Sequence, residues 1–142
     1  MVSDLRRYLA GTWTVDRTLR DLAAGVSGTF TGTATFTEND DAGLLHSERG
    51  TLLWAGGTPV AATRELNWHP GPNATSMEIY FSDGRFFHSL DLTAGTDNPT
   101  HPCAPDLYQG TFVIKRCDNW TYSWQITGPH KNLLLTTHLT RR

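Results

Sequence analysis

The chain has 142 residues, which is the length of a single domain. Only 38% of the residues are hydrophobic, but 11% are aromatic, and large rings bury enough area to close a core. The formal net charge of −2 argues against a dedicated nucleic-acid-binding protein, and the short apolar runs exclude a membrane-spanning helix.

Two cysteines, Cys103 and Cys117, are too few for a disulfide scaffold. The N-terminal sequence lacks the apolar stretch of a secretory signal peptide. We therefore expect a cytoplasmic protein that binds neither nucleic acid nor membrane. The sequence leaves the oligomeric state open, a homodimer included.

A short amphipathic helix is predicted over residues 3–9. Ser3 is a suitable N-cap, and Leu5, Tyr8 and Leu9 fall on one face. Gly11 ends this helix, and no other segment has a convincing helical period.

From Thr12 onward, apolar and polar residues alternate with the period of a β-strand. In residues 26–38 one face is apolar or small, and the other carries five threonines. The predicted strands cover residues 12–19, 26–38, 44–54, 60–68, 76–81, 85–92, 107–115, 120–126 and 132–140. Short turns between strands predict an all-β, antiparallel, up-and-down barrel of about 8–10 strands, because closure removes exposed edges.

Residues 93–105 do not fit the pattern of strands joined by short turns, because they contain Pro99, Pro102 and Pro105. The segment is too long and too rich in proline for a hairpin. Long loops in compact domains often carry function, so we expect it to line the mouth of the barrel.

The segment Gly11-Thr12-Trp13 follows the predicted helix directly. It resembles the Gly-x-Trp opening of the lipocalin and wider calycin barrels. The resemblance implies that the short helix plugs one end of the barrel and that Trp13 packs under an arginine of the last strand. Arg141 and Arg142 are the candidates for that arginine.

Three further segments are residues 83–88 (DGRFFH), 101–110 (HPCAPDLYQG) and 128–131 (GPHK). They are similar to an uncharacterised bacterial domain family that is common in actinobacteria and grouped with calycin-like barrels. The usual third motif of that family is Gly-Pro-Arg-Lys, so His130 here replaces an arginine. The resemblance implies the fold but no particular enzymatic reaction.

Several polar side chains are candidates for the barrel interior. His88 shares a face with Phe86 and Leu90, so it lies inside if they do. A buried imidazole needs a hydrogen-bond partner and titrates near neutral pH. Glu48 and Arg64 can form a buried pair across adjacent strands.

Other candidates combine a polar group with an apolar body or lie at the end of a strand. Tyr108, Tyr122 and Trp124 would present polar groups from aromatic walls. Arg85 and Lys131 follow turns at strand starts, so they can join Arg64 as contacts for an anion. Whether these cations share one end of the barrel depends on the strand count.

The segment from His101 to Tyr108 carries the densest chemistry. His101, Cys103 and Asp106 could bind a metal, but zinc usually takes four ligands and one cluster is present, so we expect none. Cys103 could be a nucleophile activated by His101 or His88. His101 or Asp106 could instead act as an acid or base at the mouth. In a purely structural alternative, Asp106 caps backbone N–H groups and Cys103 is a small buried residue.

These residues predict a barrel that binds a small molecule without a cofactor. The expected ligand is compact and anionic or carbonyl-bearing. Acid–base catalysis of an isomerase, cyclase or lyase type is left open, with His88, Asp106, Tyr108 and His101 as candidates. The expected binding residues are Arg85, Arg64, Glu48, Cys103, Trp124, Tyr122 and Lys131.

Two alternatives remain at this point. One is a haem-binding barrel like nitrobindin, with His138 of the last strand as axial ligand. However, His138 lies opposite Leu133, Leu135 and Leu139, so it points outward if the leucines point in. The other alternative is a noncatalytic interaction or dimerisation module.

Overall fold

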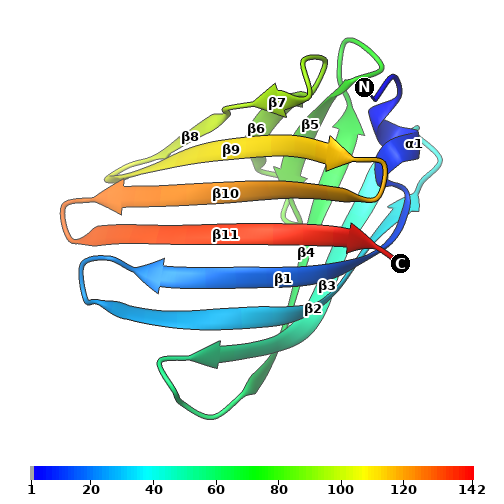
Figure 1. Ribbon diagram of the computed structural model, residues 1–142. Helices are drawn as coiled ribbons and strands as arrows, with labels where there is room; N and C mark the ends of the chain where they lie inside the picture. The colour runs from blue at the N-terminus through cyan, green and yellow to red at the C-terminus, as the bar shows by residue number, and fades with distance from the viewer. Residues whose placement is uncertain (1) are drawn as a thin grey trace.

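The computed structural model describes residues 2–142 and contains one short helix and eleven strands in that range (Figure 1). The elements are α1 (Leu5–Leu9), β1 (Gly11–Asp21), β2 (Val26–Glu38), β3 (Leu44–Trp54), β4 (Val60–Pro70), β5 (Ser76–Phe81), β6 (Phe86–Asp91), β7 (Thr96–Asp97), β8 (Thr100–Cys103), β9 (Asp106–Arg116), β10 (Asn119–Gly128) and β11 (Lys131–Arg141). The helix α1 is too short to cross a membrane, and it is the one helix within residues 2–142.

The strands form one antiparallel sheet that curls into a nearly closed barrel (Figure 1). Pairing follows the chain, and β1 also pairs with β11, so the order is β6-β5-β4-β3-β2-β1-β11-β10-β9-β7, with β8 on β9. The two ends of the sheet meet where the Asp91 backbone N–H donates to Asp97 Oδ2 at 2.8 Å. The predicted up-and-down barrel is confirmed.

The helix α1 closes one end of the barrel, as the resemblance implied. Leu5 and Leu9 point inward and are fully buried, and the Leu5 N–H donates to the Ala74 carbonyl at 2.8 Å. The N-cap is Asp4 rather than Ser3, because Asp4 Oδ1 accepts the Arg7 N–H at 3.1 Å.

Arg141 is the arginine that covers Trp13. Its guanidinium carbon lies 4.2 Å from the Trp13 ring centroid, and its N–H groups donate to the carbonyls of Tyr8 and Ala10. The Trp13 indole N–H donates to the Leu9 carbonyl at 2.8 Å. The first strand, the last strand and the helix are therefore joined around one buried ring.

The segment 93–105 is more regular than expected, because it contains β7 and β8. Both strands pair with β9, and His101 lies opposite Tyr108 in the register. Pro102 is tolerated because β8 lies at an edge, where a missing N–H breaks no ladder. These two short strands raise the count from the predicted nine to eleven.

The prediction that Phe86 shares a face with His88 and Leu90 was wrong. Tyr80 pairs with Phe86 and Ile79 pairs with His88, so Phe87 is the extra residue of a β-bulge. Phe87 turns inward and is buried, whereas Phe86 is 48% exposed. His88 and Leu90 remain inside because they follow the bulge.

The interior is filled at the helix end and open at the other. Large rings occupy the filled half: Trp13, Phe36, Trp68, Phe112 and Trp120. Toward the other end the wall is incomplete, because β5 pairs only with residues 66–70 of β4. The stretch 60–65 of β4 therefore extends past the β5–β6 hairpin and borders an opening in the side of the barrel.

We predict that Arg141→Met lowers the free energy of unfolding by about 1–3 kcal/mol, because it removes a cation–π contact and two hydrogen bonds to carbonyls. Urea denaturation measures the change. Arg142→Met is the matched control, since Arg142 is exposed, and its effect should stay within about 0.5 kcal/mol. Equal effects of the two substitutions would show that the Trp13 contact contributes nothing.

Candidate functional site

A buried ion pair lies at the centre of the barrel, between β1 and β3. Arg17 Nη1 and Nη2 donate to Glu48 Oε1 and Oε2 at 2.8 and 2.7 Å. The two side chains are only 9% and 3% exposed. Arg17 Nε donates to Thr137 Oγ1, and Nη2 also donates to the Tyr122 hydroxyl, both at 2.8 Å. The charges are buried together, and their hydrogen bonds are strong because both partners are ionised.

Arg17 was not among the residues expected at the site, although the alternation pattern contained the signal. Trp13, Val15 and Arg17 lie on one face of β1 and are all buried. Once Trp13 is placed inside by the Gly-x-Trp motif, Arg17 must also point inside.

The expected pairing of Glu48 with Arg64 exists but is the weaker contact. The two residues are direct cross-strand neighbours, and Arg64 Nη2 lies 3.8 Å from Glu48 Oε2. Arg64 Nη2 donates to the Tyr122 hydroxyl at 3.1 Å. Because Glu48 is held by two hydrogen bonds from Arg17, its charge is already matched.

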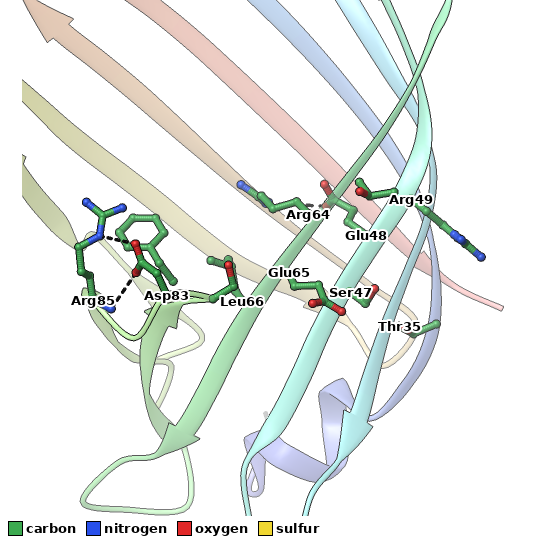
Figure 2. A pocket seen from close by; sticks show the side chains of 12 residues that line it. Thr35, Ser47, Glu48, Arg49, Arg64, Glu65, Leu66, Asp83 and Arg85 are labelled. Carbon is green, nitrogen blue, oxygen red and sulfur yellow. Dashed lines mark hydrogen bonds and ion pairs between the residues drawn. The ribbon is translucent and has the colours of Figure 1, made fainter.

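Arg64 therefore carries a positive charge that the cluster does not neutralise. Arg17 and Arg64 contribute two positive charges, and Glu48 contributes one negative charge. Arg64 is 42% exposed, and its guanidinium extends from β4 toward the space beside the β5–β6 turn (Figure 2). Arg49, one position after Glu48, points to the opposite side of β3 (Figure 2).

Arg64 lies between two openings. One is a wide cleft that runs along β3 and β4 and extends to Asp83 and Arg85 at the β5–β6 turn. Figure 2 shows the side chains that line it. The other is a cavity of about 400 Å³ that reaches into the barrel. The cavity is lined by Arg64, Phe81, Arg85, Phe87, His101, Cys103, Tyr108, Trp124, Ile126 and Leu135.

Stacked rings form one wall of this cavity. Phe81 stacks on Phe87 with centroids 4.5 Å apart, and Phe87 stacks on Trp124 at 5.1 Å. Gly110 faces Trp124 on the neighbouring strand, and a Cβ there would lie 2.9 Å from the indole. Glycine at this motif position therefore lets the indole lie against β9.

The mouth segment contributes two of its expected residues to an aromatic corner. The His101 and Tyr108 rings have centroids 5.6 Å apart, and His101 also packs on Phe87 at 5.1 Å. Cys103 lines the same cavity and is exposed, so it is not the small buried residue of the structural alternative. Asp106 turns away and accepts a hydrogen bond from Lys131 Nζ at 2.8 Å.

The other expected cations lie apart from one another. Arg85 reaches the cavity from the β5–β6 turn, where it pairs with Asp83 and lies over the Phe81 ring at 5.2 Å. Lys131 pairs with Asp106 at a different turn. His138 is exposed on the outer face of β11, so it does not point at the interior as an axial ligand must. Among residues 2–142, no three His, Cys, Asp or Glu side chains gather as metal ligands do.

His88 faces inward as expected but lies behind the main cavity. It borders a small void of about 10 Å³ and packs against Phe87 and Trp124. Its Nδ1 lies 3.0 Å from the Ser89 carbonyl, which can only accept, so Nδ1 carries the proton. Burial lowers the pKa of His88 to about 4, against the opposing effect of this hydrogen bond.

A second buried histidine, His46, borders the same void and was not expected at the site. Its ring stacks on Phe36 with centroids 4.2 Å apart, and Nε2 lies 4.0 Å from Glu48 Oε2, beyond hydrogen-bond distance. Burial lowers the pKa of His46 to about 3, and the charge of Arg64 acts in the same direction. Both histidines are therefore neutral at physiological pH.

Fold and site together define a small antiparallel barrel with a charged, aromatic-walled cavity. A family model matches residues 9–141, and the chain belongs to this family of unknown function, DUF6314. No curated protein sequence matches the chain.

Three solved structures share the fold at low sequence identity. The S-type phycobiliprotein lyase CPES from Guillardia theta is 9% identical with a TM-score of 0.71, and the alignment covers 96% of this chain and 90% of that one. A protein of unknown function from the DUF3598 family of Nostoc punctiforme is 10% identical with a TM-score of 0.64, covering 96% and 49%. The redesigned β-barrel mFAP1, bound to DFHBI, is 20% identical with a TM-score of 0.51, covering 98% and 100%.

We predict that Glu48→Gln costs about 3–5 kcal/mol of stability, because it leaves the Arg17 charge buried without a counter-charge. The double variant Arg17→Met/Glu48→Leu should recover most of this loss, since it removes both charges. Denaturant titration measures both variants, with the exposed Glu65→Gln as the control for the same chemical change. A loss below about 1 kcal/mol for Glu48→Gln would contradict a buried ion pair.

Because His46 and His88 are buried, we predict that the free energy of unfolding decreases as the pH is lowered. Both side chains take up a proton near pH 6.5 when unfolded, but only near pH 3 to 4 when folded. Below pH 6.5 the unfolded chain therefore binds more protons, and the free energy of unfolding decreases by about 1.4 kcal/mol per pH unit for each histidine. Stability measured between pH 6 and 4.5 tests this.

Two variants separate this effect from the titration of other groups. His46→Phe should remove about half of the slope, whereas His138→Gln on the outer face should leave it unchanged. A profile that is flat over this range, or identical slopes in both variants, would contradict the buried neutral state.

Proposed function

We propose that the protein binds a small aromatic carboxylate in the open half of the barrel. The observation that carries the proposal is the excess positive charge of Arg64 at the edge of an aromatic cavity. A carboxylate beside Arg64 would complete a cluster of two guanidinium groups and two carboxylates.

The chemistry of Arg64 suits such a ligand. Within residues 2–142 its one side-chain hydrogen bond is that from Nη2 to Tyr122, so the rest of its guanidinium fork is available. A guanidinium binds a planar carboxylate through two parallel hydrogen bonds. Glu48 makes no competing contact at hydrogen-bond distance, because its two oxygens are held by Arg17 at 2.8 and 2.7 Å while Arg64 Nη2 lies 3.8 Å away.

The walls suit an aromatic body of modest size. The cavity of about 400 Å³ lies at the small end of the range for ligand pockets. Phe87 and Trp124 offer ring faces, and His101 with Tyr108 offers polar edges near the mouth. The designed barrel bound to DFHBI supports the proposal in a general way, because it is a barrel of similar fold that holds a small molecule.

The positions of the four candidate acid–base residues leave two of them in contact with the cavity. His101 and Tyr108 line the cavity, whereas His88 lies behind it and Asp106 is paired with Lys131. A proton transfer on a bound ligand would therefore depend on His101 and Tyr108. The site supports binding more directly than turnover.

A thermal-shift screen of carboxylates, phosphates and aromatic acids tests the proposal. A ligand that binds only the folded state raises the melting temperature, and at a hundredfold excess over Kd it contributes about 2.7 kcal/mol. We expect aromatic carboxylates to give the largest shifts. Arg64→Met should abolish them, while Arg20→Met, which removes an exposed charge of β1, should preserve them. Shifts that survive in Arg64→Met, or no shift with any acid, would overturn the proposal.

A further inference from the structure

The small void behind the main cavity is lined by polar as well as apolar side chains. It measures about 10 Å³, which is room for about one oxygen atom. Its lining combines the apolar residues Leu66, Phe87, Phe112 and Trp124 with the polar residues His46, Arg64, Trp68, His88 and Tyr122.

Several of these polar groups have no partner. Both ring nitrogens of His46 and the indole Nε1 of Trp68 are buried without a hydrogen bond to any of residues 2–142. Unsatisfied polar groups of this kind are uncommon in folded proteins and cost stability. His46 and Trp68 both border the void, so a polar atom placed there is near groups that lack a hydrogen-bond partner.

Tyr122 adds a third donor to the same void. Its hydroxyl oxygen accepts hydrogen bonds from Arg17 at 2.8 Å and from Arg64 at 3.1 Å, which uses both lone pairs. The hydroxyl proton is therefore free to be donated. The residues around the void thus carry the unpaired Trp68 N–H, the Tyr122 hydroxyl proton and the two ring nitrogens of neutral His46. Because those two nitrogens point in different directions, one of them at most can bind the same oxygen.

We propose that this void is a subsite for one neutral oxygen of the ligand, so that the preferred ligand is a hydroxy- or oxo-carboxylic acid. The inference rests on the proposed function, because it assumes a carboxylate on Arg64. A second carboxylate does not suit the void, because it has two oxygens and a full charge. A hydroxyl or carbonyl oxygen fits the volume and matches the donors.

The position of Arg64 limits where that oxygen lies on the ligand. Arg64 borders both the main cavity and the void, so the groups that occupy them must be close together. The oxygen is therefore expected on the carbon next to the carboxylate or one carbon further along. An aryl group on the same molecule would lie against Phe87 and Trp124.

Calorimetric titration with matched acids tests this subsite. The pairs are phenyllactate with phenylpropanoate, mandelate with phenylacetate, and salicylate with benzoate, which differ only by one hydroxyl. We expect the hydroxy acid of at least one pair to bind about tenfold more tightly to the wild-type protein, since its oxygen meets otherwise unpaired donors.

Two variants show whether the void is responsible. Trp68→Phe removes the N–H together with part of the buried indole, and His46→Phe removes both ring nitrogens while keeping an aromatic ring of similar size. In each variant the preference for the hydroxy acid should disappear, while the affinity for the matched acid without the hydroxyl changes less than about threefold. A retained preference in both variants would overturn the subsite.

The outcomes also separate this inference from the proposed function. If the acids bind but no pair is discriminated, the void holds a water molecule only, and the subsite is wrong while the carboxylate site stands. If none of the six acids binds, both proposals fail.

Discussion

The double hydrogen bond between Arg17 and Glu48 determines the electrostatics of the whole barrel interior. An ion pair in the core contributes little net stability compared with apolar residues of the same volume, because both ions lose their hydration. Its structural effect is to hold the Glu48 carboxylate on Arg17, so that Arg64 lies 3.8 Å from Glu48 Oε2 without a hydrogen bond to it. The pair also orients Tyr122, whose hydroxyl receives hydrogen bonds from both arginines. A charge in the open half of the barrel is thus maintained by a neutral pair in its centre.

The architecture divides this barrel into a packed half and an open half. The helix α1, Trp13 and a set of aromatic rings fill one end and supply the core. The short β5–β6 hairpin leaves the other end incomplete, and the cavity, Arg64 and the mouth segment lie there. Phe87 and Trp124 of the cavity wall are buried members of the same core, whereas Arg64 at the edge of the cavity is 42% exposed, so its charge stays in contact with water.

Much of this fold can be predicted from the period-two alternation, and the predicted bounds of β2, β3 and β5 match those observed. Alternation assigns residues to faces but does not say which face is inside. For β1 the Gly-x-Trp motif identifies the inner face, because it places Trp13 inside, and Arg17 lies on the same face. The bulge at Phe87 depends on how β6 meets β5, and the pairing of β8 depends on a free edge of β9, so neither is visible locally. Whether Arg17 or Arg64 forms the hydrogen-bonded ion pair with Glu48 likewise depends on β1, β3 and β4, which come together only in the folded chain.

The cluster of Arg17, Arg64 and Glu48 carries one positive charge without a counter-charge. The most direct measurement compares the affinities of an aromatic acid and its amide, which share a shape and differ in charge, by calorimetry at neutral pH. We expect phenylacetate to bind at least about tenfold more tightly than phenylacetamide, and we expect a higher salt concentration to reduce the difference. Equal affinities of the two compounds would contradict this expectation.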